Sequence, residues 1–378
     1  MRRCRPDLIA LALLVGSPAS AQKPLADVST FPRPRLPADA DTNSWLAYYN
    51  LGVAQLRKHP DEAEAAFVWA TRIDPTRAEP LYGRWVAYWR RDGRLYMQYL
   101  RGRASVITAP EVIQVESLEV RALQRNPFAP RGLALVLYER RLEWVLSQNT
   151  LTDAFRAYAA GRYEAAANLF DWFVAADKDN YWARYYVALC LVATRDYERA
   201  GDQIAALVAE TRRRAADSTS HLYESLESYF YGLGLLRVEV GDSAGAREYL
   251  GQALTENLAY FPAHAELGDL ALASGDSAHA ITEYAQAAEL APRDGVIHYR
   301  YARMLTAVGQ MIDAEAELRR AIELEPYFAP SYLGLALVLE NRNARVEAAQ
   351  MYRGYLERTY RRDPRIEMAR EHLAALSP

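Results

Sequence analysis

The sequence predicts an all-α protein, a superhelical solenoid of stacked α-α hairpins, and three observations support this prediction. First, the same residue types return at a fixed offset of 34 in the numbering. The residues that show it are Gly241, Gly275 and Gly309, and then Ala246, Ala280, Ala314 and Ala348. Second, apolar residues at helical spacing lie on both sides of each of these points. Third, Pro292 and Pro326, separated by the same offset, stand where a helix would stop. A helical hairpin cannot bury its apolar face alone, so such units must stack.

Composition is typical of a folded, core-forming protein and excludes some classes of function. The chain has 378 residues, of which 51% are hydrophobic and 25% charged. Its formal net charge is -3, which argues against a general nucleic-acid binder, because such proteins carry a strongly basic domain. Lysine occurs only at Lys23, Lys58 and Lys178, so almost all cations are arginines.

The N-terminus has the three-part pattern of a secretory signal peptide over residues 1–21. Three arginines precede an apolar run over 8–15, and Ala19-Ser20-Ala21 supplies the small residues of a cleavage site. An uncleaved anchor is the alternative, but the run is much shorter than the roughly 20 apolar residues that span a bilayer. We therefore expect export to the periplasm or cell envelope of a bacterium, without a transmembrane span after cleavage. The bacterial assignment rests on the style of this signal and on the preference for arginine over lysine.

Cleavage after Ala21 would leave Cys190 as the only cysteine, so no internal disulfide is expected. Cys190 stands in an apolar helical stretch, which predicts a buried side chain. Residues 22–44 are predicted to be a linker, because prolines are spaced through a segment with few apolar residues. Either a spacer or a Pro-rich recognition segment fits this composition. The prolines are Pro24, Pro32, Pro34 and Pro37.

Residues 45–146 are predicted to form degenerate helical repeats. The first repeat carries Tyr48, Gly52 and Phe67, and the next begins with Tyr82 and Trp85. The pattern weakens between 94 and 148, where helices are expected around 111–124 and 132–145. A segment Asp61-Glu62-Ala63-Glu64 is expected at a helix start, where its charges favour the positive end of the helix dipole.

The strongest part of the array is 147–362, and it is followed by a capping helix over 363–378. At Gly241-Asp242 and Gly275-Asp276 a Gly closes one helix and an Asp opens the next, and Gly309 and Asn343 stand at the same place in the following repeats. Arg195 and Gly241 are further apart than one repeat offset, which places an insertion near 211–226. Its Arg212-Arg213-Arg214 run indicates an extended helix end followed by a solvated loop, and a basic docking patch is the alternative. The capping helix has apolar residues on one side, as the ends of such arrays require.

These residues resemble the tetratricopeptide repeat family, whose unit has the same length as the offset found here. The likeness is strongest in 261–294, 295–328 and 329–362, where large, small and aromatic residues fall at the family's positions. The resemblance implies that the first helix of each unit lines a concave groove, which takes a protein or peptide segment. The family's ligand-facing positions, with neighbouring rings and one neighbouring arginine, fall on Phe155, Tyr158, Trp182, Tyr185, Tyr231, Tyr299, Arg300 and Arg303.

The sequence contains no constellation that indicates catalysis. It has no Gly-rich phosphate loop and no His-Glu-x-x-His motif. Gly241-Asp242-Ser243-Ala244-Gly245 matches Gly-x-Ser-x-Gly, but this segment is expected between two helices of a repeat and not at the strand-to-helix elbow that such a nucleophile needs. His264 and His298 stand at the same position of adjacent units. A shared metal would need a third ligand at defined spacing, so packing is the preferred interpretation and neither a metal site nor a cofactor is predicted.

The sequence is compatible with two candidate functions. The first is a non-enzymatic scaffold that binds an extended protein segment in the groove, because rings supply contact area and arginines supply directed donors. The alternative is an accessory protein of the envelope that binds or processes glycans, because aromatic faces also stack on sugar rings.

Overall fold

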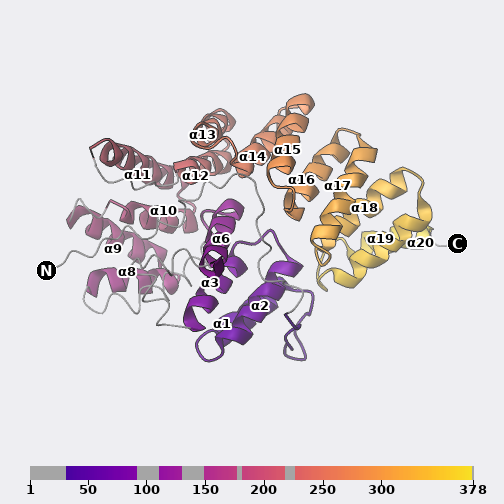
Figure 1. The fold of residues 1–378 in the computed structure, drawn as a ribbon, viewed down its shortest axis with the longest axis horizontal. Helices are drawn as coiled ribbons and strands as arrows, with labels where there is room; N and C mark the ends of the chain where they lie inside the picture. Colours follow the sequence, from indigo (N-terminus) through magenta and orange to yellow (C-terminus); the bar gives the residue numbers. More distant parts are fainter. Residues whose placement is uncertain (1–30, 92–109, 130–148, 177–180, 218–225, 377–378) are drawn as a thin grey trace. The chain divides into compact units, whose positions relative to one another are not determined.

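A computed structural model describes residues 31–91, 110–129, 149–176, 181–217 and 226–376. These residues form 17 helices and no strand, and the fold is an all-α helical repeat solenoid (Figure 1). The helices of the first half are α1 (Trp45–Gln55), α2 (Pro60–Ile73), α3 (Glu79–Arg91), α6 (Pro110–Arg125), α8 (Asn149–Ala159), α9 (Tyr163–Ala176), α10 (Ala183–Ala193) and α11 (Tyr197–Asp217). Those of the second half are α12 (Leu226–Glu239), α13 (Ser243–Glu256), α14 (Phe261–Ala273), α15 (Ser277–Leu290), α16 (Gly295–Ala307), α17 (Met311–Leu324), α18 (Ala329–Asn341), α19 (Arg345–Arg358) and α20 (Ile366–Leu376).

The described residues divide into two compact units. Unit 1 takes 56–64 and 78–258, and unit 2 takes 31–55, 65–77 and 259–376. Unit 2 is therefore built from two stretches that are far apart in the sequence. It contains the three repeats with the clearest repeat pattern, in the hairpins α14–α15, α16–α17 and α18–α19.

The turns inside the hairpins have the geometry that the sequence predicts. Gly241, Gly275 and Gly309 have φ values of 80°, 82° and 83°, in the left-handed region that glycine adopts without steric cost. At the same place in the last repeat, Asn343 has a φ of 60°. The Asp276 carboxylate then caps α15, because it accepts a hydrogen bond from the His279 N–H at 3.1 Å.

Small residues lie where the two helices of a hairpin approach each other. Ala246, Ala280, Ala314 and Ala348, which recur at the repeat offset, are all 0% exposed. Between the helices of repeat 261–294, the Tyr284 ring covers the backbone of Gly268. Pro292 and Pro326 follow the ends of α15 and α17, where helix termination was predicted.

Outside the clearest repeats, the structure describes some of the predicted segments and not others. The helix expected around 111–124 is α6, and the one expected around 132–145 lies outside the described residues, as do the predicted signal peptide and residues 22–30. The described part of the predicted linker, 31–44, contains no helix and is hydrogen-bonded to the C-terminal repeats. Helix α11 continues to Asp217, as expected of an extended helix end, and 218–225 lie outside the described residues.

The C-terminal helix α20 packs on α19. Its Ala369 is 0% exposed, and Met368, Leu373 and Leu376 pack against the apolar cluster around Tyr352 and Tyr355. This is the amphipathic arrangement expected of a cap. Within the described residues, no helix is both long enough and apolar enough to cross a membrane.

Candidate partner-binding surface

In unit 1, three of the aromatic residues predicted to line a groove lie in the packed interior. Phe155, Tyr158 and Tyr231 are 2%, 0% and 2% exposed. The Phe155 ring packs edge-on against Phe170 and Tyr186, at centroid distances of 5.1 and 5.2 Å. These rings join helices within unit 1, so the structure offers no surface on them for a partner.

Trp182 and Tyr185 are half-buried and belong to one aromatic cluster. Both rings contact Tyr186, at centroid distances of 5.7 and 5.9 Å. The Tyr185 hydroxyl donates a hydrogen bond to the Pro127 carbonyl at 2.9 Å, and burial raises the pKa of this phenol. Tyr185 thus holds the loop after α6 against α10, and its hydroxyl is already used.

In unit 2, the first helices of successive repeats present one equivalent exposed position each. Helix α16 contacts both α14 and α18, and Asp269, Arg303 and Leu337 stand on these three helices, one repeat offset apart. All three side chains are exposed, and Leu337 is 39% exposed. We call Asp269, Tyr299, Arg303 and Leu337 the unit 2 surface.

Tyr299 lies one helical turn before Arg303 and is half-buried. Its ring packs edge-on against Phe328 with centroids 5.2 Å apart, and the Arg303 guanidinium lies 5.9 Å from the ring centroid. Burial raises the pKa of Tyr299, while Arg303 and Arg365 oppose this shift. Tyr299 is therefore a neutral hydrogen-bonding group at neutral pH, and its hydroxyl forms no hydrogen bond within the described residues.

The two predicted arginines differ in their partners. Arg300 donates to Glu266 at 2.9 Å and to Asp269 at 2.5 Å, both on α14, so its charge is compensated between repeats. Arg303, in contrast, has no carboxylate partner within the described part of the chain. Its charge is available to an anionic group from outside.

A second arginine acts on Tyr299 from the end of the array. Arg365 donates to both carboxylate oxygens of Asp363, at 2.9 and 2.7 Å, and this hydrogen bonding lowers the pKa of Asp363 to about 2. Sequence reasoning missed Arg365, because it lies beyond the last repeat and has no register position. Leu337 was also missed, although its repeat offset from Arg303 could have identified it.

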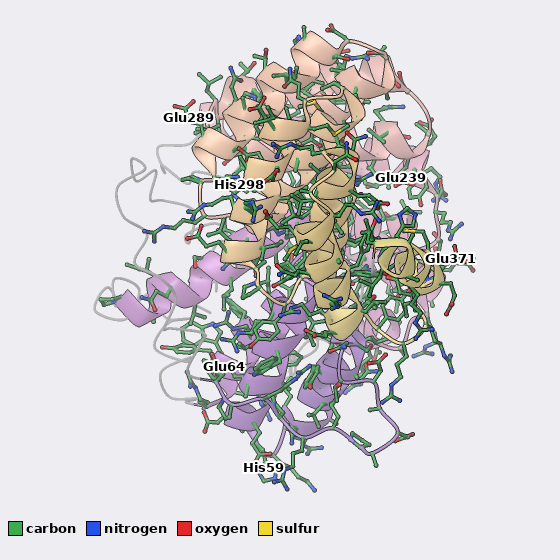
Figure 2. The ribbon with its side chains drawn as sticks, turned by 90° about the vertical axis from the view of Figure 1, so that its right-hand side faces the viewer. His59, Glu64, Glu239, Glu289, His298 and Glu371 are labelled. Carbon is green, nitrogen blue, oxygen red and sulfur yellow. The ribbon has the colours of Figure 1, made fainter. Side chains whose placement is uncertain are left out.

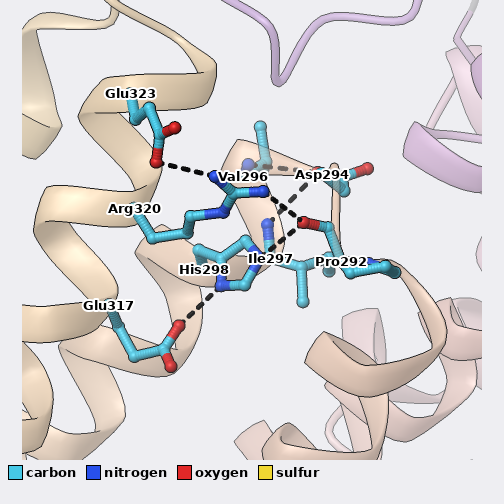
Figure 3. A network of polar contacts seen from close by, with 8 residues as sticks. All are labelled: Pro292, Asp294, Val296, Ile297, His298, Glu317, Arg320 and Glu323. Carbon is cyan, nitrogen blue, oxygen red and sulfur yellow. Dashed lines mark hydrogen bonds and ion pairs between the residues drawn. The ribbon is translucent and has the colours of Figure 1, made fainter.

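His264 and His298, which stand at the same position of adjacent repeats, each lie beside a glutamate of the following helix. The Nδ1 atom of His264 lies 2.7 Å from Glu283, and that of His298 lies 2.6 Å from Glu317. His298 lies among helices and is 8% exposed, whereas His59 is exposed (Figure 2). Figure 3 shows His298 between Glu317 and the Pro292 carbonyl, with Arg320 nearby. Within the described residues, no group of three or more His, Cys, Asp or Glu side chains is placed to hold a metal ion.

The arginine run of the insertion is charge-compensated. Arg212 pairs with Glu256 at 2.5 Å, and Arg213 and Arg214 both pair with Glu210 at 2.6 Å. Hydrogen bonds from these two arginines lower the pKa of Glu210 to about 2. The pairing favours an extended helix end over a basic docking patch.

Residues 261–294, the hairpin α14–α15 with its flanking turns, match the family model described as tetratricopeptide repeat. This segment is a tetratricopeptide repeat. The tetratricopeptide repeat contains His264, Glu266 and Asp269, so part of the unit 2 surface lies on it. No curated protein matches this sequence.

Several solved structures are similar to this chain. YrrB, a tetratricopeptide repeat protein with an unusual peptide-binding site, is 16% identical, with a TM-score of 0.40 over 54% of this chain and 98% of its own. The C-terminal part of a repeat protein from Cytophaga hutchinsonii is 14% identical, with a TM-score of 0.45 over 60% and 95% of the two chains. The Cut9–Hcn1 complex is 13% identical, with a TM-score of 0.45 over 88% and 76%.

The His298 pair predicts a pH dependence of stability. Burial lowers the pKa of His298, but Glu317 and the Pro292 carbonyl raise it further than burial and Arg320 lower it, so the net shift is upward. A raised folded pKa means that the pair stabilises fully below the unfolded pKa of roughly 6.5 and that this stabilisation is lost as pH rises through the folded value.

We therefore expect His298→Gln to cost more free energy of unfolding at mildly acidic pH than at alkaline pH. Urea unfolding of both chains over a pH series measures this difference. A cost that is the same at every pH would mean that His298 acts only through packing.

Proposed function

We propose that this protein is a non-enzymatic interaction scaffold that binds an extended protein segment along the unit 2 surface. The helical repeat fold supports a role in protein–protein interaction. The observation that carries the proposal is Arg303, an exposed cation beside a half-buried ring and without a carboxylate partner in the described residues.

The chemistry of this surface indicates what it would recognise. Arg303 offers directed donors to a carboxylate, Tyr299 offers a free hydroxyl, and Leu337 offers exposed apolar area one repeat further on. An extended segment that carries an acidic side chain and, further along, an aliphatic side chain complements these three groups. Because the positions repeat along neighbouring helices, the segment would cross the helices rather than follow one of them.

The glycan alternative has weaker support. Stacking on a sugar ring needs an open aromatic face, but the Tyr299 ring contacts both Phe328 and Arg303. In unit 1 the buried rings Phe155, Tyr158 and Tyr231 offer no such face either.

A peptide array tests the proposal directly. The full-length chain is applied to extended peptides of acidic, neutral and basic composition, each with and without an aliphatic residue. We expect acidic peptides with an aliphatic residue to be retained most strongly and to be released at high salt. Arg303→Glu should weaken their binding by roughly tenfold or more, because it replaces attraction with repulsion.

The matched control is Arg353→Glu, the same charge change at an exposed arginine of α19 outside the unit 2 surface. It should leave peptide binding unchanged. If both variants weaken peptide binding equally, the effect comes from the net charge of the protein and not from the unit 2 surface. If the chain binds neutral oligosaccharides and Arg303→Gln still binds them, the glycan alternative is favoured.

Export is part of the same proposal. If residues 1–21 are a cleaved signal, the intact mass of the secreted chain corresponds to a start at Gln22. A mass that retains residues 1–21 would indicate an anchor instead.

A further inference from the structure

The first part of unit 2 contacts the last repeats although the two lie near opposite ends of the sequence. Residues 31–55 and 65–77 belong to the same compact unit as 259–376. We call 31–55 and 65–77 the clasp. Two separate sets of contacts connect the clasp to residues 326–361, one polar and one aromatic.

The polar contacts lie at the C-terminus of α19. The Asn43 side-chain amide donates to the Glu357 and Thr359 carbonyls, at 2.9 and 3.1 Å. The Arg361 N–H donates to an Asp41 carboxylate oxygen at 2.6 Å. The last carbonyls of a helix have no partner within the helix, so Asn43 satisfies groups that would otherwise need water. The other Asp41 oxygen accepts from the Asn43 N–H at 2.9 Å, which fixes the two side chains relative to each other.

The aromatic contacts lie at the turn between α17 and α18. The Trp69 ring packs edge-on against Tyr327 with centroids 5.0 Å apart, and the Arg72 guanidinium lies near both rings, at 4.7 and 5.8 Å. Arg33 covers Trp69 at 4.8 Å and donates to the Tyr48 hydroxyl at 2.9 Å. Arg33 thereby connects residues 31–44 to Tyr48 of α1 and Trp69 of α2.

Each side of this junction has its own apolar core. In the clasp, Phe67 is 0% exposed and packs between Tyr49 and the Gly52 backbone. In the last repeat, Tyr352 and Tyr355 are buried with Ala369 of α20. The contacts of the junction lie near the surface, because the Asn43–Glu357 and Arg361–Asp41 hydrogen bonds are exposed and Tyr327 remains 36% exposed. Regions that are joined by few buried contacts open locally before the cores on either side unfold.

The junction is also continuous with the unit 2 surface. Tyr327 contacts the clasp, and the next residue, Phe328, packs against Tyr299. A change in the position of the α17–α18 turn therefore reaches the ring that stands beside Arg303.

We infer that the clasp is a conformational device, which opens from residues 326–361 as one body and thereby regulates the unit 2 surface. The regulatory part rests on the proposed function, whereas the opening does not. Partner binding and clasp closure are coupled through Tyr327 and Phe328, and such coupling acts in both directions.

Hydrogen exchange of the full-length chain tests the opening without any ligand. Tyr327→Ala weakens only the aromatic contacts. If the clasp opens as one body, the Arg361 amide, which lies in the polar contacts, should exchange roughly tenfold faster. The control Ile312→Ala changes a 71% exposed side chain of α17 and should leave that amide unchanged.

Two results would overturn the opening. An unchanged exchange rate at Arg361 in Tyr327→Ala would show that the two contact sets are independent. Acceleration throughout α18 and α19 would show that the whole repeat unfolds instead.

A second measurement tests the regulation. Asn43→Ala loosens the polar contacts without touching the unit 2 surface, and Asp39→Ala is its control at a neighbouring exposed residue. The affinity for an acidic peptide selected on the array should change several-fold in Asn43→Ala only. Equal affinity in both variants would refute the regulation and leave the opening intact. Absence of any peptide binding by the unaltered chain would refute the proposed function, and with it the regulation, but not the exchange result.

Discussion

Tyr284→Ala is expected to lower the free energy of unfolding of unit 2 by about 3–5 kcal/mol, the usual cost of removing a large buried ring. Tyr284 is 1% exposed and stacks on Tyr301 with an interplanar angle of 4°. Its ring fills the space over Gly268, and its hydroxyl donates to the Asp269 carboxylate. Gly268 has no side chain that could move into the cavity, so little collapse is expected.

The control Tyr284→Phe keeps the ring and removes only the hydroxyl. Because Arg300 still pairs with Asp269, this loss should cost about 1 kcal/mol. Urea unfolding monitored by helicity measures both variants, and hydrogen exchange assigns the loss to α14–α17. A similar cost in the two variants would show that the hydrogen bond, not the ring, holds the hairpins together.

The repeated part of the fold could be predicted from the sequence because every hairpin needs the same kinds of residue at the same places. The left-handed turn at Gly275, the cap at Asp276 and the small residue at Ala280 are local requirements of one hairpin. Residues that meet local requirements recur at a fixed offset, and that offset is therefore visible without a structure. The helices over 366–376 and 110–125 follow from apolar periodicity in the same way.

The candidate site could be predicted only in part, because a register position does not say which way a ring packs. Tyr231 holds the register position of Tyr299, and Phe155 that of Arg303, yet both rings are only 2% exposed. Arg300 was predicted to face a partner, but carboxylates on the preceding repeat neutralise it. Glu266 stands one repeat offset earlier, so an offset comparison of charges could have indicated this pair.

The clasp contacts lay beyond any prediction from one sequence. Asn43 and Thr359 are 316 residues apart, and neither belongs to the repeat pattern. The composition of 22–44 indicates few apolar residues and many prolines, which describes a linker. The Asp41 and Asn43 side chains nevertheless find backbone groups at the end of α19, and such partners carry no sequence signature.

Glycines inside helices provide the second large effect, and two of them are expected to respond with opposite sign. A Cβ atom at Gly268 would lie 2.6 Å from the Tyr284 ring, which is buried and cannot move aside. Gly268→Ala should therefore destabilise unit 2 by about 1–3 kcal/mol, as overpacking of a core does. A Cβ atom at Gly251 of α13 would meet nothing within 4 Å. Gly251→Ala should stabilise unit 1 by about 0.5–1 kcal/mol, because alanine loses less backbone entropy in a helix.

A double variant that combines Gly268→Ala with Tyr284→Ala isolates the contact between residue 268 and the Tyr284 ring. In a Tyr284→Ala background the ring that opposes a Cβ atom is absent, so Gly268→Ala should become neutral or stabilising. The cost of the double variant is then smaller than the sum of the single costs, as expected of residues in contact. Urea unfolding of the four chains gives this coupling energy. If the losses of unfolding free energy are additive, the cost of Gly268→Ala does not come from a clash with the Tyr284 ring. Glycine at this position would then be required by the backbone of α14.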